Sequence, residues 1–137
     1  MKKALLFLVV LFTGACSPEN ASETPLAEEF IRGADMSFLP LIESEGTQYK
    51  HNGLPQDALI TLKNAGCNTV RIRIWVNPSA ATSSLNEVKL LAERVKQLGM
   101  KVWLTVHYSD TWADPSHQTK PANWQNLSFT DLKNTVS

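Results

Sequence analysis

The chain has 137 residues, of which 43% are hydrophobic and 8% aromatic, and its 13 basic side chains are balanced by 13 acidic ones. This length and composition are typical of one globular domain at most, and they exclude collagen-like and disordered chains. Because a nucleic-acid surface needs lysine and arginine concentrated on one face, the zero net charge argues against nucleic acid as a partner.

The first 15 residues are predicted to be a signal peptide of the lipoprotein type. Two lysines precede an apolar run over residues 4–12, which is much shorter than the ~20 residues of a membrane-spanning helix. Small residues then lead to Cys16, in a pattern that resembles a bacterial lipoprotein signal. We expect Cys16 to be the lipid attachment site and the anchor to reach a bacterial membrane, with ordinary secretion as the alternative.

The residues after the signal are predicted to form a flexible tether over 16–29, which is rich in Ser, Pro, Glu, Asn and Ala. If Cys16 is acylated, Cys67 has no cysteine left with which to form a disulfide. Because unpaired cysteines are usually buried and inert, we expect Cys67 to be a packing residue. The folded part is then expected to occupy residues 30–137.

From residue 30 onward the pattern alternates between strand and helix. Residues 30–35 form a short apolar run that ends in Asp35 and predicts a first strand. Residues 54–65 have apolar positions at helical spacing and are followed by a capping glycine. Residues 68–75 predict a second strand, in which β-branched side chains alternate with two arginines and a tryptophan.

The second predicted helix has the strongest local signal. Ser84 and Glu87 have the spacing of a capping box. Apolar residues then recur at helical intervals until Gly99 ends the run. The sequence therefore predicts a helix that begins after Ser84 and stops before Gly99.

A third strand is predicted over residues 101–108, parallel to the second through a right-handed crossover. Residues 109–126 are polar, contain prolines and predict a long loop. Residues 127–136 begin another helix, with Ser128 or Thr130 as its cap. Each predicted strand is thus followed by a helix.

This α/β order matches either the first three βα units of a (β/α)8 TIM barrel or a small open sheet. A whole barrel needs roughly 250 residues, about twice what remains after the signal. We therefore expect these 137 residues to be the N-terminal part of a longer protein.

Polar residues gather where the predicted strands end, and parallel folds build their sites at these carboxyl ends. Asp35 follows the first strand, and His107, Asp110 and Trp112 follow the third. Arg71 lies inside the second strand, where a cation is costly unless it meets a carboxylate. We expect Arg71 to face anionic partners, with Arg73 either in the same network or nearer the rim.

Four stretches carry a resemblance to a known family. They are GADMS at 33–37, GCNTVRIRIW at 66–75, GMK at 99–101 and HYSDTWADP at 107–115, with Pro121 and Trp124 beyond. In these stretches, which span nearly all of residues 30–137, the chain resembles family 53 of the glycoside hydrolases, the endo-β-1,4-galactanases. It departs from the family pattern at Thr105, where an aspartate is expected, and at Cys67, where an aliphatic residue is usual.

The resemblance implies a (β/α)8 barrel that cleaves internal β-1,4-galactosyl bonds of galactan and type I arabinogalactan in pectin, with retention of configuration. No cofactor is expected, no metal ligand is assigned within this chain, and a calcium site in later loops is left open. Retaining chemistry uses two carboxyl groups ~5 Å apart. By the resemblance both are Glu residues beyond Ser137. We therefore expect this stretch to be inactive alone.

The resemblance also implies roles for individual residues. Arg71 would keep the nucleophile ionised, and His107 would contact the galactose or the nearby carboxylates, although a structural arginine and a core histidine are the alternatives. Asp35 would line the floor of the cleft. Asp110 would bind sugar hydroxyls or only cap its loop, and Trp112 would stack on a sugar ring.

Two other functions remain open from the residues. His107, Asp110, Asp114 and His117 are nitrogen and oxygen donors close in sequence, so a metal-dependent hydrolase is an alternative. A non-catalytic glycan-binding surface lipoprotein would suit the tether. Two carboxylate pairs, Glu43 with Glu45 and Asp110 with Asp114, are interpreted as solvated loop residues rather than as catalytic acids.

Overall fold

The structure is a computed structural model that describes residues 30–137, so the predicted signal, Cys16 and the tether lie outside the described residues. The described elements are, in chain order, β1 (Gly33–Asp35), α1 (Leu39–Ser44), β2 (Lys50–His51), β3 (Leu54–Pro55), α2 (Ala58–Asn64), β4 (Thr69–Ile74), α3 (Leu85–Gln97), β5 (Lys101–Val106), η1 (Ala122–Trp124) and α4 (Phe129–Val136). Within this part of the chain, no helix is long and apolar enough to cross a membrane.

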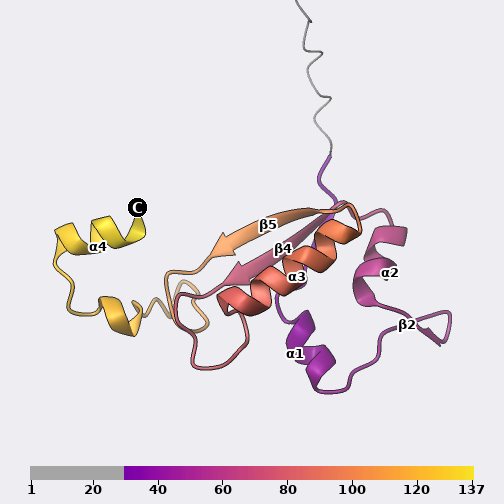
Figure 1. The fold of residues 1–137 in the computed structure, drawn as a ribbon, viewed down its shortest axis with the longest axis horizontal. Helices are drawn as coiled ribbons and strands as arrows, with labels where there is room; N and C mark the ends of the chain where they lie inside the picture. The colour runs from indigo at the N-terminus through magenta and orange to yellow at the C-terminus, as the bar shows by residue number, and fades with distance from the viewer. Residues whose placement is uncertain (1–29) are drawn as a thin grey trace, which may run out of the picture.

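The central sheet has the strand order β1-β4-β5, and both strand pairs are parallel. The predicted α/β fold with parallel strands is therefore confirmed. Figure 1 shows α3 running alongside β4 and β5, whereas α4 stands apart from the sheet beyond the long loop. The short strands β2 and β3 form a separate antiparallel hairpin.

The strand register divides the side chains of the sheet between two faces. Asp35 pairs with Arg71, and Arg71 pairs with Trp103. Arg73 pairs with Thr105 in the same way. Since side chains two apart along a strand point to one face, these five residues share a face. The polar side chains of three strands are thereby collected on one side of the sheet.

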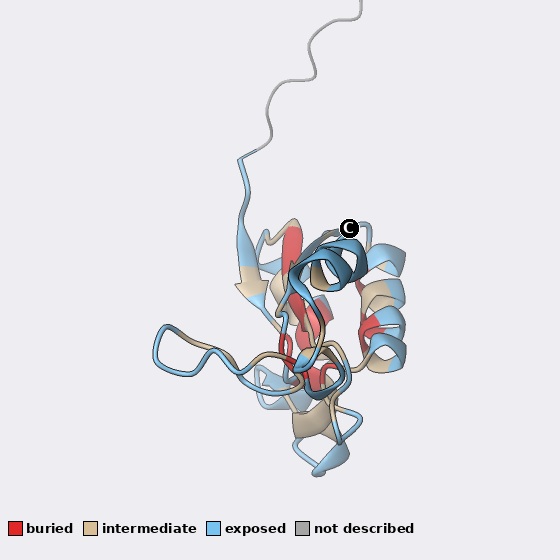
Figure 2. Ribbon diagram, turned by 90° about the vertical axis from the view of Figure 1, so that its left-hand side faces the viewer, coloured by how far each residue is buried: buried red, intermediate tan, exposed pale blue. Residues whose placement is uncertain are grey.

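The hydrophobic core lies on the other face of the sheet, beneath the helices. Its buried members come from α1, α2, β4, α3 and the residue before β5, and they are Leu39, Ala58, Leu59, Val70, Ile72, Val88, Leu91, Val95 and Met100. Figure 2 shows the buried residues gathered between β4 and the helices, while α4 is exposed. The predicted helix over Leu85–Gln97 is confirmed, and its apolar stripe supplies three of these core residues.

Gly33 is required by the close approach of β1 to β4. A Cβ atom at this position would lie 2.7 Å from the backbone oxygen of Thr69. That separation is shorter than a van der Waals contact with an atom that cannot move aside. The glycine therefore lets β1 pair with β4 and places Asp35 beside Arg71.

The predicted helix over residues 54–65 is wrong in its first turn. Asn52 and Gly53 have positive φ and turn the chain into β3, so Leu54 pairs with the hairpin instead of starting a helix. Asp57 then caps α2, because its carboxylate accepts hydrogen bonds from the backbone N–H groups of the next turn. The helix α1, which contains Pro40 in its first turn, was not predicted.

The predicted capping box of α3 is confirmed in part. Ser84 is the N-cap and accepts a hydrogen bond from the backbone N–H of Glu87. The Glu87 carboxylate accepts from the backbone N–H of Ser83, one residue earlier than a capping box requires. At α4, Ser128 rather than Thr130 is the cap.

Candidate active site

Arg71 lies in β4, the central strand, and its side chain contacts both neighbouring strands. Its Nη1 donates to Asp35 Oδ2 in an ion pair, and its Nε donates to Thr105 Oγ1 over 2.9 Å. The prediction that Arg71 meets a carboxylate is confirmed. Arg71 also bonds to residues of both neighbouring strands, as the alternative of a structural arginine requires. The role of Arg71 beside a nucleophile stays a prediction.

Asp35 is held by Ser37 as well as by Arg71. The backbone N–H and the hydroxyl of Ser37 both donate to Asp35 Oδ1. Burial raises the pKa of Asp35, but the Ser37 hydrogen bonds and the charge of Arg71 outweigh it and lower the pKa below its ordinary value. Asp35 is therefore a carboxylate at neutral pH, and it is suited to hold Arg71 rather than to donate a proton.

Arg73 is buried behind the site among aromatic rings. Its side chain is 2% exposed, and its guanidinium carbon is 4.4 Å from the Phe38 ring centre and 4.9 Å from those of Trp75 and Trp112. Of the two positions predicted for Arg73, the structure places it on the face of Arg71 and not at an exposed rim. Rings from the ends of β1, β4 and β5 cover it.

His107 is the first residue after β5. Its backbone N–H donates to the carbonyl of Ile74 over 2.9 Å. Its ring lies edge-on to that of Trp112, with centroids 6.3 Å apart. Burial lowers the pKa of His107, and the positive charges of Arg73 and Arg71 lower it further. The imidazole is therefore neutral at pH 7.

In the complete protein, we expect the His107 ring to titrate below the ordinary histidine pKa of about 6.5. Since the folded pKa lies below the unfolded one, His107 stabilises the fold fully above pH ~6.5, and this contribution is lost as the pH falls through the folded pKa. NMR titration of the ring, assigned by its loss in His107→Gln, measures this. Removing a charge in Arg73→Met should raise the pKa. A His107 pKa above 6.5 would contradict the prediction.

Trp112 is held at the mouth of the site by Asp114. The indole Nε1 donates to Asp114 Oδ2 over 3.0 Å, and the Trp112 side chain is 50% exposed. Hydrogen bonds from Ser116, then from His117 and Trp112, lower the pKa of Asp114 to about 2. Asp114 is thus an ionised acceptor throughout the physiological range, and it orients the ring that the sequence predicts to stack on sugar.

Asp110 organises loops rather than presenting a free carboxylate. Its Oδ1 accepts from the backbone N–H of Asn77 over 2.9 Å, and its Oδ2 accepts from that of Ala122 over 2.8 Å. These bonds connect the loop after β4 to η1. They favour the loop-capping role over sugar binding, the two roles that the sequence left open.

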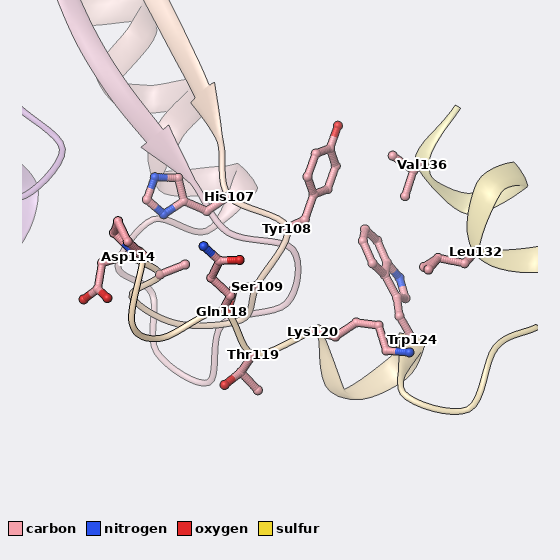
Figure 3. Close-up of a pocket in the computed structure, with 12 residues that line it drawn as sticks. His107, Tyr108, Ser109, Asp114, Gln118, Thr119, Lys120, Trp124, Leu132 and Val136 are labelled. Carbon is pink, nitrogen blue, oxygen red and sulfur yellow. The ribbon is translucent and has the colours of Figure 1, made fainter. Parts of the chain in front are cut away.

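Three hollows border these residues. One of about 270 Å³ is lined by Asp35 and Arg71. A second, of about 370 Å³, is lined by Asp35, Phe38, Arg73 and Trp112. The third, of about 580 Å³, lies between the loop after β5 and α4, and Figure 3 shows His107 on one side of it and Trp124 and Leu132 on the other. Asp35 lines the first two hollows, which also contain the two arginines of β4, so we place the candidate active site there.

The structure does not assemble the metal site that was an alternative from the sequence. Asp114 lies near His117, with Oδ1 to Nδ1 at 3.2 Å, but Asp110 is occupied by backbone N–H groups. Among residues 30–137 no three or more His, Cys, Asp or Glu side chains are grouped to hold a metal ion. The prediction that Glu43 is a solvated loop residue is wrong, because Glu43 lies in α1 and forms a bidentate ion pair with Arg94.

The structure also reveals residues that the sequence did not single out. Ser37 joins Asp35 to the backbone N–H of Arg73, and Ser83 accepts a hydrogen bond from the Arg73 guanidinium. Phe38 contributes a ring to the same cluster. Phe38 and the serines lie outside the predicted strands, and only the folded arrangement of the loops brings them to the arginine.

The chain is similar to known glycosidases over nearly all the described residues. A sequence profile described as glycosyl hydrolase family 53 matches residues 31–137. A protein of Neosartorya fischeri named probable arabinogalactan endo-beta-1,4-galactanase A is 52% identical over 120 residues, 87% of this chain and 32% of that protein. Arabinogalactan endo-beta-1,4-galactanase A of Emericella nidulans is 47% identical over 102 residues, 74% of this chain and 28% of the relative. The chain thus spans about a third of these relatives or less.

Two solved structures share the fold. The Ignisphaera aggregans GH53 catalytic domain superposes with a TM-score of 0.75 at 38% identity, covering 82% of this chain and 34% of that one. A chain from a study of two fungal beta-1,4-galactanases superposes with a TM-score of 0.68 at 44% identity, covering 71% of this chain and 30% of the other. In both cases the match is to part of a larger domain.

Proposed function

Because the chain belongs to glycoside hydrolase family 53, we propose that the complete protein is a retaining endo-β-1,4-galactanase. Its substrate is then galactan or type I arabinogalactan, the side chains of pectin. The observation that carries the proposal is the cluster of Arg71 with Asp35, which ends β1, and Thr105, which lies one residue before the end of β5, bordered by a half-exposed Trp112. Carboxyl ends of parallel strands are where such folds place their reacting groups.

Residues 30–137 supply the first three βα units of the (β/α)8 barrel in this proposal, with the catalytic Glu residues beyond Ser137. Retaining hydrolysis proceeds in two displacements. In the first, one carboxyl protonates the leaving oxygen while the other attacks the anomeric carbon and forms a glycosyl-enzyme. In the second, water cleaves that bond, with the first residue acting as base. In this proposal neither carboxyl lies among residues 30–137, and we expect those residues alone to be inactive.

The described residues act around that chemistry. Arg71 is pinned through Nη1 and Nε, and its partly exposed guanidinium presents positive charge to the side where a nucleophile must stay ionised. A neutral His107 both donates to and accepts from hydroxyl groups, which suits a galactose ring. Trp112 supplies an apolar ring face for the C–H groups of the sugar. Asp35 and Asp114 hold Arg71 and Trp112 in place.

Incubating the complete protein with β-1,4-galactan tests this proposal. We expect release of galacto-oligosaccharides of several lengths, with the β-anomer formed first by NMR, and no release from β-1,4-glucan. Galactan binding without any hydrolysis would overturn the enzymatic proposal in favour of a glycan-binding surface protein. First appearance of the α-anomer would overturn retention.

We further propose that the complete protein is exported to the cell envelope, with a lipid on Cys16 as its anchor and residues 16–29 as its tether. The support is the sequence pattern at the N-terminus. In a bacterial host, Cys16→Ser is expected to move the protein from the membrane fraction to the soluble one. An unchanged distribution would contradict the lipid anchor.

A further inference from the structure

Arg73 is a buried arginine that the proposed mechanism does not use. Arginine is almost never fully buried unless a carboxylate pairs with it. Arg73 is 2% exposed, yet within residues 30–137 it forms no ion pair, and its buried Nε has no hydrogen-bond partner. Its Nη2 donates only to Ser83 Oγ, over 3.3 Å. Its principal contacts must therefore be of another kind.

Those contacts are with three aromatic rings, one in the segment that follows each strand of the central sheet. Phe38 follows β1, Trp75 follows β4 and Trp112 follows β5, and each ring centre is within 4.9 Å of the Arg73 guanidinium carbon. A planar guanidinium stacks on several rings at once, whereas an ammonium is a compact point charge. Arg73 therefore contacts the segments that follow three different strands.

Of the three rings, Phe38 and Trp112 also stack on each other. Phe38 and Trp112 are nearly parallel, at 16°, with centroids 6.5 Å apart. Since the guanidinium carbon is 4.4 Å and 4.9 Å from these centroids, it lies off the line that joins them and does not separate the rings. Phe38 and Trp112 are 39% and 50% exposed, and both line the same hollow as Asp35.

We propose that Arg73 is a positioning residue that holds Phe38 and Trp112 as one rigid aromatic surface for the sugar chain. It acts through the rings and touches no reacting atom. Phe38 thereby becomes a second ring for substrate beside Trp112. The inference rests on the proposed function for the identity of the sugar, but the effect of Arg73 on the Trp112 ring is a property of the free protein and is measured separately.

The first experiment examines the ring without any substrate. The complete protein is labelled with 5-fluorotryptophan, and the Trp112 ¹⁹F resonance is assigned as the one lost in Trp112→Phe. Arg73→Met keeps the length of the side chain but removes the charge, and we expect it to shift and broaden this resonance. Arg73→Lys keeps the positive charge but lacks the planar guanidinium, and we expect it to shift the Trp112 resonance less, in the same direction.

Arg94→Met is the matched control. Arg94 is a partly buried arginine that pairs with Glu43 and Asp57 on the helical side of the fold. Its loss should lower the melting temperature but leave the Trp112 resonance within its linewidth. If Arg73→Met leaves the resonance unchanged, or if Arg94→Met moves it equally, the proposal is overturned.

The second experiment measures KM and kcat for hydrolysis of short β-1,4-galacto-oligosaccharides. We expect Arg73→Met to raise KM about fivefold, in line with a desolvated cation–π contact, and to change kcat less than twofold. In a Trp112→Leu background the same substitution should add almost nothing to KM, because its effect passes through that ring. Equal KM increases in both backgrounds would refute the positioning role. A wild-type protein without hydrolysis would refute the proposed function alone, since the ¹⁹F result stands without it.

Discussion

Replacing Arg71 with methionine in the complete protein is expected to lower kcat for galactan hydrolysis by on the order of a hundredfold, with a smaller change in KM. Arg71 is held by Asp35 and Thr105 at the carboxyl edge of the sheet, and its positive charge is the group proposed to keep the nucleophile ionised. Without that charge the pKa of the nucleophile rises, so the acidic limb of the pH–rate profile should also move to higher pH.

Arg32→Met is the control for this variant. Arg32 donates from Nε to the carbonyl of Gly66 over 2.8 Å, just before β1 and β4 begin, and so lies at the opposite edge of the sheet. It should leave both kcat and the pH profile unchanged. If Arg71→Met stays folded and retains more than a fifth of the wild-type kcat, Arg71 is a structural residue and its proposed role is wrong.

Truncating Leu91 to alanine is expected to destabilise the complete protein by about 3 kcal/mol. Leu91 is 2% exposed and packs from α3 onto the core that includes Val70 and Ile72 of β4. Its loss removes apolar burial and leaves a cavity between helix and sheet. Equilibrium unfolding in urea measures the change as a lower midpoint with an unchanged slope.

The neighbouring Leu90 offers a matched control of the same residue type. It is 64% exposed on the outer side of α3. Leu90→Ala should change the free energy of unfolding by less than about 0.5 kcal/mol. If both alanine variants shift the midpoint equally, the orientation of α3 on the sheet is wrong.

The elements that the sequence predicted best are those with strong local signals. The Ser84 cap and the apolar stripe of α3 are short-range features, and the helix begins and ends within one residue of the prediction. The strand β4 was equally clear from its β-branched residues. The start of the helix predicted over 54–65 was wrong. Asn52 and Gly53 have positive φ and form a hairpin turn, so Leu54 pairs in a strand although its position fits the helical spacing.

The candidate site was predictable only in part. Asp35, Arg71 and His107 were found because each lies in or directly after a strand, where spacing decides the face. The loop residues were harder, since the partners of Asp110 and Trp112 depend on how the chain returns after β5. A loop-capping role was one of two left open for Asp110, but its two backbone N–H partners and the bond from Trp112 to Asp114 were not predicted.

From the amino acids alone came the alternation of strand and helix, the polar strand ends and the resemblance to family 53, which the match over residues 31–137 confirms. These features are local, because propensity, capping and side-chain alternation act within a few residues. Only the tertiary structure decided that Arg73 is buried among Phe38, Trp75 and Trp112. Its contacts join the ends of three strands, and packing between segments so far apart in the chain depends on how the whole sheet assembles.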